Sequence, residues 1–347
     1  MVEGRKVLLL ESDAAAMFPL SSGLRKNGWA VVGAMDAAQA MQIGRQQKPD
    51  AVVVNAQLAG GGGIVALQRL RSSAYTANIP AICITRPNSR ERDEFAAAGA
   101  LEMVDPPGDP GMISAALGRA LNRPQALHLV PKEVLAAPPR VAALAESGLL
   151  DGPVEPAFDE LTRLAATLLN TPLALVSVVD TDRQFFKSQF GLGEPLKSAR
   201  QTPLSHSFCQ WVVGGNEELV VDDARSHPVL ATNLAVRDFG VTAYAGVPFR
   251  TNEQALGSFC AVDVTPRSWT EEDLATLRDL SSVVEAYVAE KHGALDPAAR
   301  LAATGNAVIG ATRVLVRGLP RCGPGERTAL ARIAEEQSRR MVRLAAS

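Results

Sequence analysis

Short apolar runs alternate with amphipathic stretches along residues 6–121 of the chain. The runs do not alternate apolar and polar residues, a pattern typical of strands in a parallel sheet that helices cover on both faces. Five strand–helix units predict a doubly wound α/β domain of the flavodoxin-like type, with its site at the carboxyl ends of the strands. The runs are KVLLL, WAVVGA, AVVVN, AICIT and LEMV, and the helices are expected at Ala15–Asn27, Ala37–Gln47, Ile64–Arg71, Ser89–Ala98 and Asp109–Leu121.

A hairpin is predicted much further along the chain. The segments Tyr244–Arg250 and Leu256–Val262 are rich in apolar, β-branched and aromatic residues, and the polar sequence TNEQA joins them. Gly246 and Gly257 lie inside these strands, where glycine usually marks a bulge or the close approach of another backbone or a ligand. We expect the hairpin to form the centre of an antiparallel sheet in a second, α+β domain.

The composition is that of a globular protein. The chain has 347 residues, 47% of them apolar, and a formal net charge of -2, so it can form two or three domains and shows no whole-chain charge signal for nucleic acid or a membrane. No apolar run approaches the roughly 20 residues of a spanning helix, and the start MVEGRKVLLLESD becomes charged too soon for a secretory signal. These features predict a cytoplasmic protein without a membrane segment.

The four cysteines lie far apart in the sequence and form no CxxC pair. This spacing predicts neither a structural zinc site nor a disulfide framework, and we expect no metal and no cofactor. The cysteines are Cys83, Cys209, Cys260 and Cys322.

Residues 1–122 are similar to the receiver domain of bacterial response regulators. In that family an acidic pair after the first strand holds Mg²⁺, an Asp at the end of the third strand accepts a phosphoryl group, a Thr or Ser ends the fourth strand, and a Lys before a Pro ends the fifth. The corresponding positions hold Glu11, Ser12 and Asp13, then Asn55, Thr85 and Pro106.

The departures from the family pattern predict a pseudo-receiver. The amide of Asn55 has no nucleophilic carboxylate oxygen and cannot form an acyl phosphate. Ser12 and Asn55 replace carboxylates that Mg²⁺ prefers, and no ammonium group stands at the lysine position. We therefore expect a receiver fold kept as a protein-binding platform. The alternative is an unconventional active site built on Glu11, Asp13 and Asp105.

A second resemblance, to the GAF domain family of small-molecule and redox sensors, runs from about Pro139 to Ala289. It implies a GAF-like sensor domain over 139–291, preceded by a proline-bearing linker at 123–138 and followed by a helical tail at 292–347. The motifs of cyclic-nucleotide and bilin-binding members are not found. The segments that carry the resemblance are FDELTRLAATLLN, PLALVSVVDTDRQFFKSQFGL, SHSFCQWVV, LVVDDARSHPVLATNLAV, the predicted hairpin and SWTEEDLATLRDLSSVVEAYVA.

The resemblance implies a ligand pocket between the central sheet and the segments lying over it. We expect its walls to draw on SHSFCQW, on LVVDDAR and on the hairpin from Tyr244. Each candidate also has a purely structural interpretation, as a buried small hydrophobe, a core aromatic, a satisfied histidine or a helix cap. The candidate pocket residues are His206, Cys209, Trp211, Asp222, Asp223 and Tyr244.

Cys260 lies on the second strand of the hairpin, and the alternation of strand side chains places it on the face opposite Phe259 and Ala261. Some GAF-fold proteins reduce free methionine sulfoxide with cysteines around the pocket. That chemistry needs a thiolate and a second thiol within reach, so the distance between Cys209 and Cys260 decides whether this alternative is feasible.

The tail predicts an αα-hairpin, because Asp296 and Pro297 mark a helix start and LPRCGPGE interrupts the helical pattern before ERTALARIAEEQSRRMVRLAAS. We expect its apolar stripes to pack on a copy of the chain or on a partner. From Asp296 onward the chain has nine arginines and four acids. Because no aromatic residues are interleaved, a solvated face is favoured over nucleic-acid binding, and a DNA-binding regulator is kept as an alternative.

Together these features favour a non-catalytic signalling protein of the two-component type. It would couple a small-molecule or redox signal, sensed by the GAF-like domain, to a protein partner such as a histidine kinase or a regulator. The receiver surface and the tail helices would make that contact. Helices that flank GAF domains commonly pair, so the resemblance implies a homodimer. Its small ligand is unknown.

Overall fold

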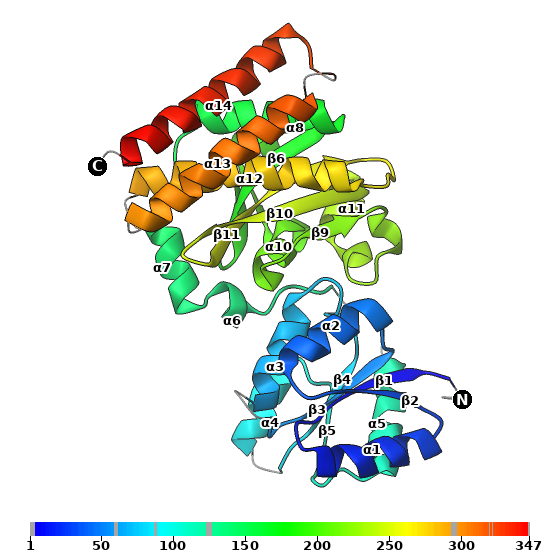
Figure 1. Cartoon of the computed structure of the whole chain (residues 1–347). Coiled ribbons are helices and arrows are strands. Elements are labelled where there is room, and N and C mark those ends of the chain that lie inside the picture. The colour runs from blue at the N-terminus through cyan, green and yellow to red at the C-terminus, as the bar shows by residue number, and fades with distance from the viewer. Residues whose placement is uncertain are drawn as a thin grey trace. The chain divides into compact units, whose positions relative to one another are not determined.

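The structure, a computed structural model, describes residues 4–58, 62–86, 89–122, 127–292, 297–318, 320 and 322–345. The chain divides into two compact units, Met1–Pro131 and Lys132–Ser347 (Figure 1). Each unit has its own sheet and its own buried core.

The first unit is built on a five-stranded parallel sheet with the strand order β2-β1-β3-β4-β5. This is the order of the flavodoxin-like fold, so the predicted α/β class is confirmed. The strands are β1 (Lys6–Leu10), β2 (Ala30–Ala34), β3 (Ala51–Asn55), β4 (Ala81–Ile84) and β5 (Glu102–Val104), and the helices are α1 (Ala14–Lys26), α2 (Ala37–Gln47), α3 (Gly62–Ser72), α4 (Ser89–Ala97) and α5 (Pro110–Leu121).

Side chains of this sheet are buried on both faces, as the unbroken apolar strands predict. In β1, Leu8 and Leu10 belong to the cluster that packs under α2, α3 and α4, whereas Val7 and Leu9 face α1 and α5. Local signals set where the helices begin: Asp109 accepts a hydrogen bond from the backbone N–H of Met112, and Pro110 takes the first helical position of α5.

The second unit is built on a six-stranded antiparallel sheet with the order β8-β7-β6-β11-β10-β9. The predicted hairpin lies in it as β10 and β11, with β10 next to the edge strand β9, so an α+β domain with an antiparallel sheet is confirmed. The strands are β6 (Leu173–Val179), β7 (Arg183–Phe190), β8 (Gln201–Pro203), β9 (Leu219–Val221), β10 (Ala243–Thr251) and β11 (Gln254–Asp263).

The hairpin turn is shorter than the predicted TNEQA. Thr251 pairs with Gln254, which leaves only Asn252 and Glu253 in the turn. Both have positive φ, 51° and 63°, as a two-residue turn matched to the strand twist requires. A bulge after Phe249 also shifts the register within the hairpin.

Gly246 and Gly257 permit close approaches, as predicted. The ring of Tyr244 and the hydroxyl of Ser258 occupy the space over Gly246, so a Cβ there would lie within 3.0 Å of both. A Cβ on Gly257 would meet the backbone oxygen of Ser177 and the ring of Phe249 within the same limit. The two glycines therefore allow close packing of the hairpin with its neighbours.

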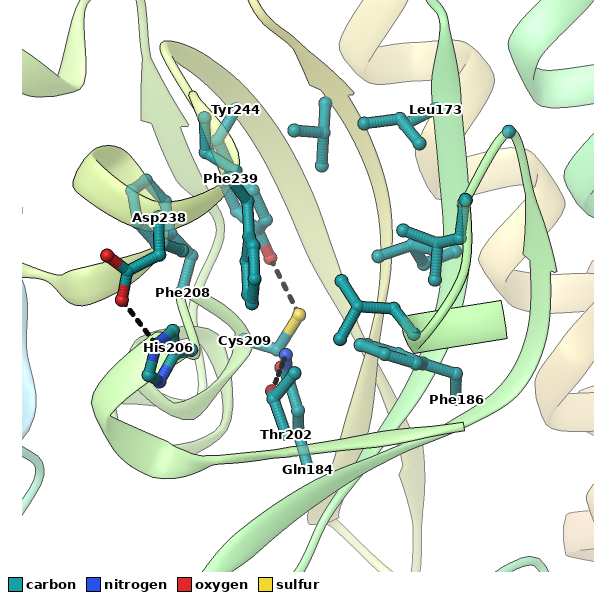
Figure 2. Close-up of a pocket in the computed structure, with 18 of the residues that line it drawn as sticks. Leu173, Gln184, Phe186, Thr202, His206, Phe208, Cys209, Asp238, Phe239 and Tyr244 are labelled. Atoms are coloured by element: carbon teal, nitrogen blue, oxygen red, sulfur yellow. Dashed lines mark hydrogen bonds and ion pairs between the residues drawn. The ribbon is translucent and has the colours of Figure 1, made fainter. Parts of the chain in front are cut away.

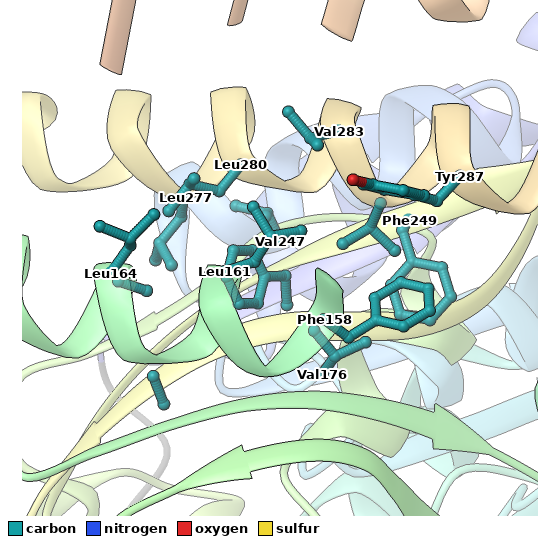
Figure 3. Close-up of a cluster of buried hydrophobic side chains, with 14 of the residues drawn as sticks. Phe158, Leu161, Leu164, Val176, Val247, Phe249, Leu277, Leu280, Val283 and Tyr287 are labelled. Atoms are coloured by element: carbon teal, nitrogen blue, oxygen red, sulfur yellow. The ribbon is translucent and has the colours of Figure 1, made fainter. Parts of the chain in front are cut away.

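One face of this sheet packs against two long helices, α8 (Pro156–Leu169) and α12 (Glu271–His292) (Figure 3). Val247 and Phe249 of β10 point into this core, together with Phe259 of β11. Strand alternation sends Tyr244 and Cys260 to the opposite face. That second face is covered by short helices, α10 (Cys209–Gly215) and α11 (Leu234–Phe239), and by loops.

The segment predicted as a linker at 123–138 is in part structured. Helix α6 (Lys132–Leu135) belongs to the second unit, so the units divide after Pro131 instead of after residue 138. Helix α7 (Pro138–Ser147) follows, and its buried Arg140 donates hydrogen bonds to the backbone oxygens of Leu135 and Val179. These bonds fix α6 to the second unit.

The tail helix α13 (Pro297–Gly318) packs on α12, α14 (Pro324–Ala345) packs on α13, and both extend the core of the second unit. Val314, Leu330 and Ile333 are buried in the same cluster as the sheet. The expectation that the tail buries its stripes on a copy or a partner is therefore wrong for these side chains, and the predicted boundary at 291/292 does not separate two units. The predicted N-cap Asp296 lies outside the described residues.

Removing all residues after His292 is expected to destabilise the second unit. The truncation deletes Val314, Leu330 and Ile333 and exposes the apolar side chains of α8 and α12 in the same cluster, and burial stabilises each such side chain by about 1.5–3 kcal/mol. The change should appear as unfolding at lower urea concentration and as binding of a hydrophobic dye. Equal urea midpoints for the full and truncated chains would contradict this packing, and light scattering of both chains tests whether the tail also holds a dimer together.

No helix in the described parts of the chain combines the length and the apolar character needed to cross a membrane.

Candidate functional site

The position equivalent to a receiver phosphoacceptor is occupied by an amide that is already engaged. The side-chain N–H of Asn55, at the end of β3, donates to the carboxylate of buried Glu11, and its oxygen accepts from the backbone N–H of Gln57 at 3.0 Å. Glu11 also accepts from the backbone N–H of Asp13 at 2.9 Å. The carboxylate of Glu11 thus accepts hydrogen bonds from two groups of the protein itself.

The other receiver positions do not form an alternative acidic site. Asp13 caps α1 by accepting from the backbone N–H of Ala15, and Asp105 pairs with Arg92 at 3.1 Å. Within the described residues, no group of three or more His, Cys, Asp or Glu side chains is placed to hold a metal ion. Ser12 lies in the loop between β1 and α1, and exposed Pro106 lies in the turn after β5. The hydroxyl of buried Thr85 has no hydrogen-bond partner among the described residues.

A cavity of about 470 Å³ lies on the second face of the antiparallel sheet (Figure 2). Its floor is formed by β6, β7, β10 and β11, and its walls by α10, α11 and the loop 191–196. The volume is that of a small organic molecule. The side chains and glycines that line it are Leu173, Leu175, Gln184, Phe186, Gly191, Leu192, Gly193, Glu194, Pro195, Leu196, Thr202, His206, Phe208, Cys209, Ala235, Asp238, Phe239, Val241, Tyr244 and Val262.

Most of this lining is aliphatic or aromatic, and some of its polar groups are satisfied by the protein. Gln184 donates to the hydroxyl of Thr202 at 2.7 Å and accepts from the hydroxyl of Ser207 at 2.6 Å. Such fixed polar groups shape the cavity and leave its apolar surface to make most of the contact with a ligand.

A histidine–aspartate pair stands in the cavity wall. His206 Nε2 lies 3.0 Å from Asp238 Oδ2, and the imidazole packs against the ring of Phe239 with centroids 5.2 Å apart. The hydrogen bond from Arg237, which has the larger effect, and the one from His206 lower the pKa of Asp238 to about 2. Asp238 is therefore an anion that orients the His206 ring toward the cavity.

Cys209 and Cys260 meet below the cavity, between the first residue of α10 and strand β11. Their sulfur atoms lie 3.8 Å apart, and both side chains are buried. The hydroxyl of Tyr244 lies 3.4 Å from Cys209 Sγ and 3.1 Å from the Ser258 hydroxyl. Cys209 lines the cavity, so one sulfur of the pair faces the space in which a ligand would sit.

The hydrogen bonds around Cys209 favour its thiolate. The hydrogen bond from the Cys260 thiol has the largest effect on the pKa of Cys209 and lowers it. Burial raises this pKa, but the hydrogen bond from the Tyr244 hydroxyl also lowers it, and the result is a pKa of about 7. Burial raises the pKa of Cys260 and of Tyr244 well above the usual values. Cys260 and Tyr244 therefore remain protonated and donate to Cys209.

The structure brings together three of the six candidate pocket residues. His206, Cys209 and Tyr244 line the cavity, whereas Trp211, Asp222 and Asp223 do not. Buried Trp211 lies outside the lining. Asp222 accepts from the backbone N–H of Trp269 at 3.4 Å, and Asp223 caps a short helix by accepting from Arg225 N–H at 3.0 Å. The expectation that LVVDDAR contributes to the wall is wrong.

The sequence interpretation missed the wall that replaces LVVDDAR. It consists of the loop 191–196 and of α11, which contribute the acidic residues Glu194 and Asp238 to the lining. A signal for the loop exists, since Gly191 directly follows a strand and Gly193 and Pro195 come soon after, a composition typical of loops, on which binding residues often lie. Asp238 has no comparable signal, because its pairing with His206 depends on the fold.

Comparison with family models assigns both units. Residues 7–117 match the response regulator receiver domain, and residues 153–288 match the GAF domain. The order and the types of domain agree with the resemblances found in the sequence. This combination is typical of two-component signalling.

Curated relatives match parts of the chain. A cyclic di-GMP phosphodiesterase of Pseudomonas aeruginosa is 34% identical over 152 residues, which are 43% of this chain and 25% of that protein. Protein PilH of the same organism is 30% identical over 80 residues, 23% of this chain and 66% of that protein. The phosphate regulon regulator PhoB of Escherichia coli is 27% identical over 120 residues, 34% of this chain and 52% of that protein. The matched part of the chain thus spans between a quarter and two thirds of the length of these relatives.

Solved structures match the chain over about a third of its length. The receiver domain of a sensor histidine kinase from Pseudomonas aeruginosa covers 35% of this chain and 99% of its own, at 22% identity and a TM-score of 0.33. The chemotaxis protein CheY4 of Vibrio cholerae covers 33% of this chain and 98% of its own, at 20% identity and a TM-score of 0.32.

Proposed function

Because the chain carries a response regulator receiver domain followed by a GAF domain, we propose that it is a non-catalytic signalling protein of the two-component type. The GAF domain senses a small organic molecule or a redox change. The receiver surface and the tail helices bind a protein partner, such as a histidine kinase or a regulator, and the chain acts as a homodimer. The receiver serves as a binding platform and is not phosphorylated.

The cavity of about 470 Å³ carries the sensing part of this proposal. It combines a mostly apolar lining with a few polar groups, which is the usual make-up of a small-molecule site. Two of those groups, His206 and Cys209, come from neighbouring turns of one segment, and Tyr244 comes from the central hairpin.

Filling the cavity is expected to abolish ligand retention. Ala235 is buried in the α11 wall, so Ala235→Phe would occupy the space of a ligand, whereas Ala231→Phe adds the same side chain at an exposed position nearby. Native mass spectrometry of protein purified from its own host should show a small molecule on the wild type and on Ala231→Phe, with at least about tenfold less on Ala235→Phe. Equal retention by all three, or none by the wild type, would remove the support for a sensor.

The receiver is expected not to take up phosphate from acetyl phosphate and Mg²⁺. The Asn55 amide offers no carboxylate oxygen, and its N–H group occupies Glu11. Asn55→Asp should not restore full activity, because Ser12 and Pro106 still replace the family's acidic and lysine positions. Intact-mass measurement tests this, and an acid-labile phosphate on Asn55 would contradict the platform assignment.

One observation favours a second function, that of a thiol oxidoreductase. The 3.8 Å between Cys209 and Cys260 meets the requirement for two thiols within reach that methionine sulfoxide reduction imposes. Turnover of free methionine sulfoxide with dithiothreitol as reductant, lost in Cys209→Ser, would favour the enzyme over the non-catalytic sensor.

The arginines of the tail give little support to a DNA-binding regulator. Arg317 pairs with Asp279, Arg332 with Glu160, and Arg340 with Glu290 at 2.7 Å. Side chains held by carboxylates of the protein contribute less charge to a phosphate-binding surface. A salt-dependent mobility shift on duplex DNA would reverse this assessment.

A further inference from the structure

Two buried cysteines, from different elements, meet at the floor of the cavity of the second unit. We propose that Cys209 and Cys260 are a redox modification site, which an organic hydroperoxide bound in the cavity oxidises to a disulfide. The inference rests on the proposed sensing function of the cavity and assigns the chemical class of the signal.

The geometry needs only a small adjustment to form the bond. The sulfur atoms are 3.8 Å apart, and a disulfide is about 2.05 Å long, so they must approach by roughly 1.8 Å. Cys83 is buried in the core of the first unit and Cys322 in the core under the tail. Neither of these two thiols lines the cavity, whereas Cys209 does, and Cys260 is the thiol in contact with Cys209.

The surroundings of Cys209 supply the groups that peroxide chemistry requires. A thiolate is the nucleophile, and the hydrogen bonds from Cys260 and Tyr244 favour the thiolate of Cys209. The departing alkoxide needs a proton donor, and the Tyr244 hydroxyl lies 3.4 Å from the sulfur. Ser258, 3.1 Å from that hydroxyl, keeps it in place.

The reaction consists of two balanced steps. The Cys209 thiolate, whose proton has passed to solvent, attacks the terminal oxygen of R–O–O–H and the O–O bond breaks. Tyr244 gives its proton to the departing alkoxide, which leaves as ROH, and Tyr244 then takes up one proton from solvent. The Cys260 thiol then attacks the sulfur of the Cys209 sulfenic acid, an S–S bond forms, and the S–O bond breaks to release water. Two electrons pass from the two thiols to the peroxide, and a cellular dithiol reverses the change by thiol–disulfide exchange.

The lining of the cavity selects an organic peroxide. Cys209 is only 2% exposed, so an oxidant must reach its sulfur through the cavity. Phe186 and Phe208 give that space apolar walls (Figure 2), and Leu175 also lines it. An alkyl or aryl body gains binding free energy there by leaving water, at roughly 25 cal/mol per Å², whereas hydrogen peroxide has no such body.

Disulfide formation would move elements next to the unit boundary. Cys209 is the first residue of α10, and α10 contacts α6, which directly follows Pro131. Drawing Cys209 toward β11 also moves its sulfur atom away from the Tyr244 hydroxyl, which donates a hydrogen bond to that sulfur in the reduced form. The oxidised and reduced forms would therefore differ at α10, which gives the signal a structural consequence.

The test uses the reduced full-length protein with cumene hydroperoxide as the probe and hydrogen peroxide at the same concentration for comparison. We expect the intact mass to fall by about 2 Da, with one peptide pair linking Cys209 to Cys260. Cumene hydroperoxide should react at least about tenfold faster than hydrogen peroxide, because its ring is buried on binding.

Variants identify the role of each group. Cys260→Ser should stop at a sulfenic acid on Cys209, a gain of about 16 Da that dimedone traps, whereas Cys209→Ser should not react. Tyr244→Phe should slow the first step about a hundredfold. Cys83→Ser and Cys322→Ser are the matched controls, buried cysteines outside the cavity, and should leave the rate unchanged. Peptide mapping of the wild type tests the linkage even if a variant fails to fold.

Retention of all thiols, or a disulfide that does not join Cys209 to Cys260, would overturn the proposal. A rate with hydrogen peroxide equal to or above that with cumene hydroperoxide would overturn the assigned ligand class. These results are separate from the sensing function: a pair that stays reduced in a protein that still retains a host ligand removes only the redox site. A wild-type protein that retains no ligand from its host would instead contradict the sensing function itself.

Discussion

Replacing Gly257 by alanine is expected to destabilise the second unit by about 3 kcal/mol or more. Gly257 lies in β11 between Val178 and Phe249, and a Cβ there would meet the backbone oxygen of Ser177 and the Phe249 ring within 3.0 Å. Neither can move freely: Ser177 belongs to the neighbouring strand, and Phe249 is fully buried in the main core (Figure 3). The new methyl group must therefore separate β11 from β6 or displace the aromatic ring.

Gly305→Ala is the matched control. Gly305 lies in α13 of the same unit, and a Cβ there has no neighbour within 4 Å. Alanine is favoured over glycine in a helix by about 1 kcal/mol, so this variant should be slightly more stable than the wild type. Urea unfolding followed by tryptophan fluorescence measures both changes. A Gly257→Ala protein as stable as the wild type would show that β6 and β11 are not packed as closely as the structure has them.

Both sheets could be predicted because their signals are local. Each strand of the first unit is a short apolar run, and each lies within two residues of its expected position. In the second unit, strand alternation alone placed Cys260 opposite Phe259 and Ala261. The structure puts these two in the main core and Cys260 beside Cys209.

The contact between Cys209 and Cys260 could not be predicted, because it depends on how α10 lies across the sheet. The path of a loop between two elements is set by tertiary packing, and sequence spacing does not record it. For the same reason LVVDDAR was misplaced: β9 ends the sheet beside β10, and Asp222 and Asp223 follow it away from the cavity. The packing of the tail on its own domain could not be predicted either, because an apolar stripe in the sequence does not show which surface covers it.

The state of Cys209 also links the site to stability. Its pKa of about 7 lies below the usual thiol value, so ionisation of Cys209 favours the folded protein. This contribution is present above the pKa of an unfolded thiol, near 8.5, and is lost as the pH falls through about 7. The unfolding free energy should therefore rise with pH across this window in the wild type and less so in Cys209→Ser.

Gly246→Ala is expected to raise the pKa of Cys209 toward that of an ordinary thiol while leaving every hydrogen-bonding side chain of the site in the chain. The ring of Tyr244 lies directly over Gly246, and an added Cβ would meet its hydroxyl end and the Ser258 hydroxyl within 3.0 Å. Tyr244 must then tilt away, and Cys209 loses a donor that favours its thiolate.

The rate of alkylation of Cys209 by iodoacetamide, followed by peptide mapping as a function of pH, reports this pKa because only the thiolate reacts. In the wild type the rate should reach half its maximum near pH 7, and in Gly246→Ala at a higher pH, with up to about a hundredfold slower reaction at neutral pH. Tyr244→Phe should shift the profile in the same direction, since it removes the same donor, and Gly305→Ala should not shift it. Identical profiles for Gly246→Ala and the wild type would mean that the tyrosine hydroxyl does not control the thiolate, and Tyr244 would then be a packing residue of the cavity wall.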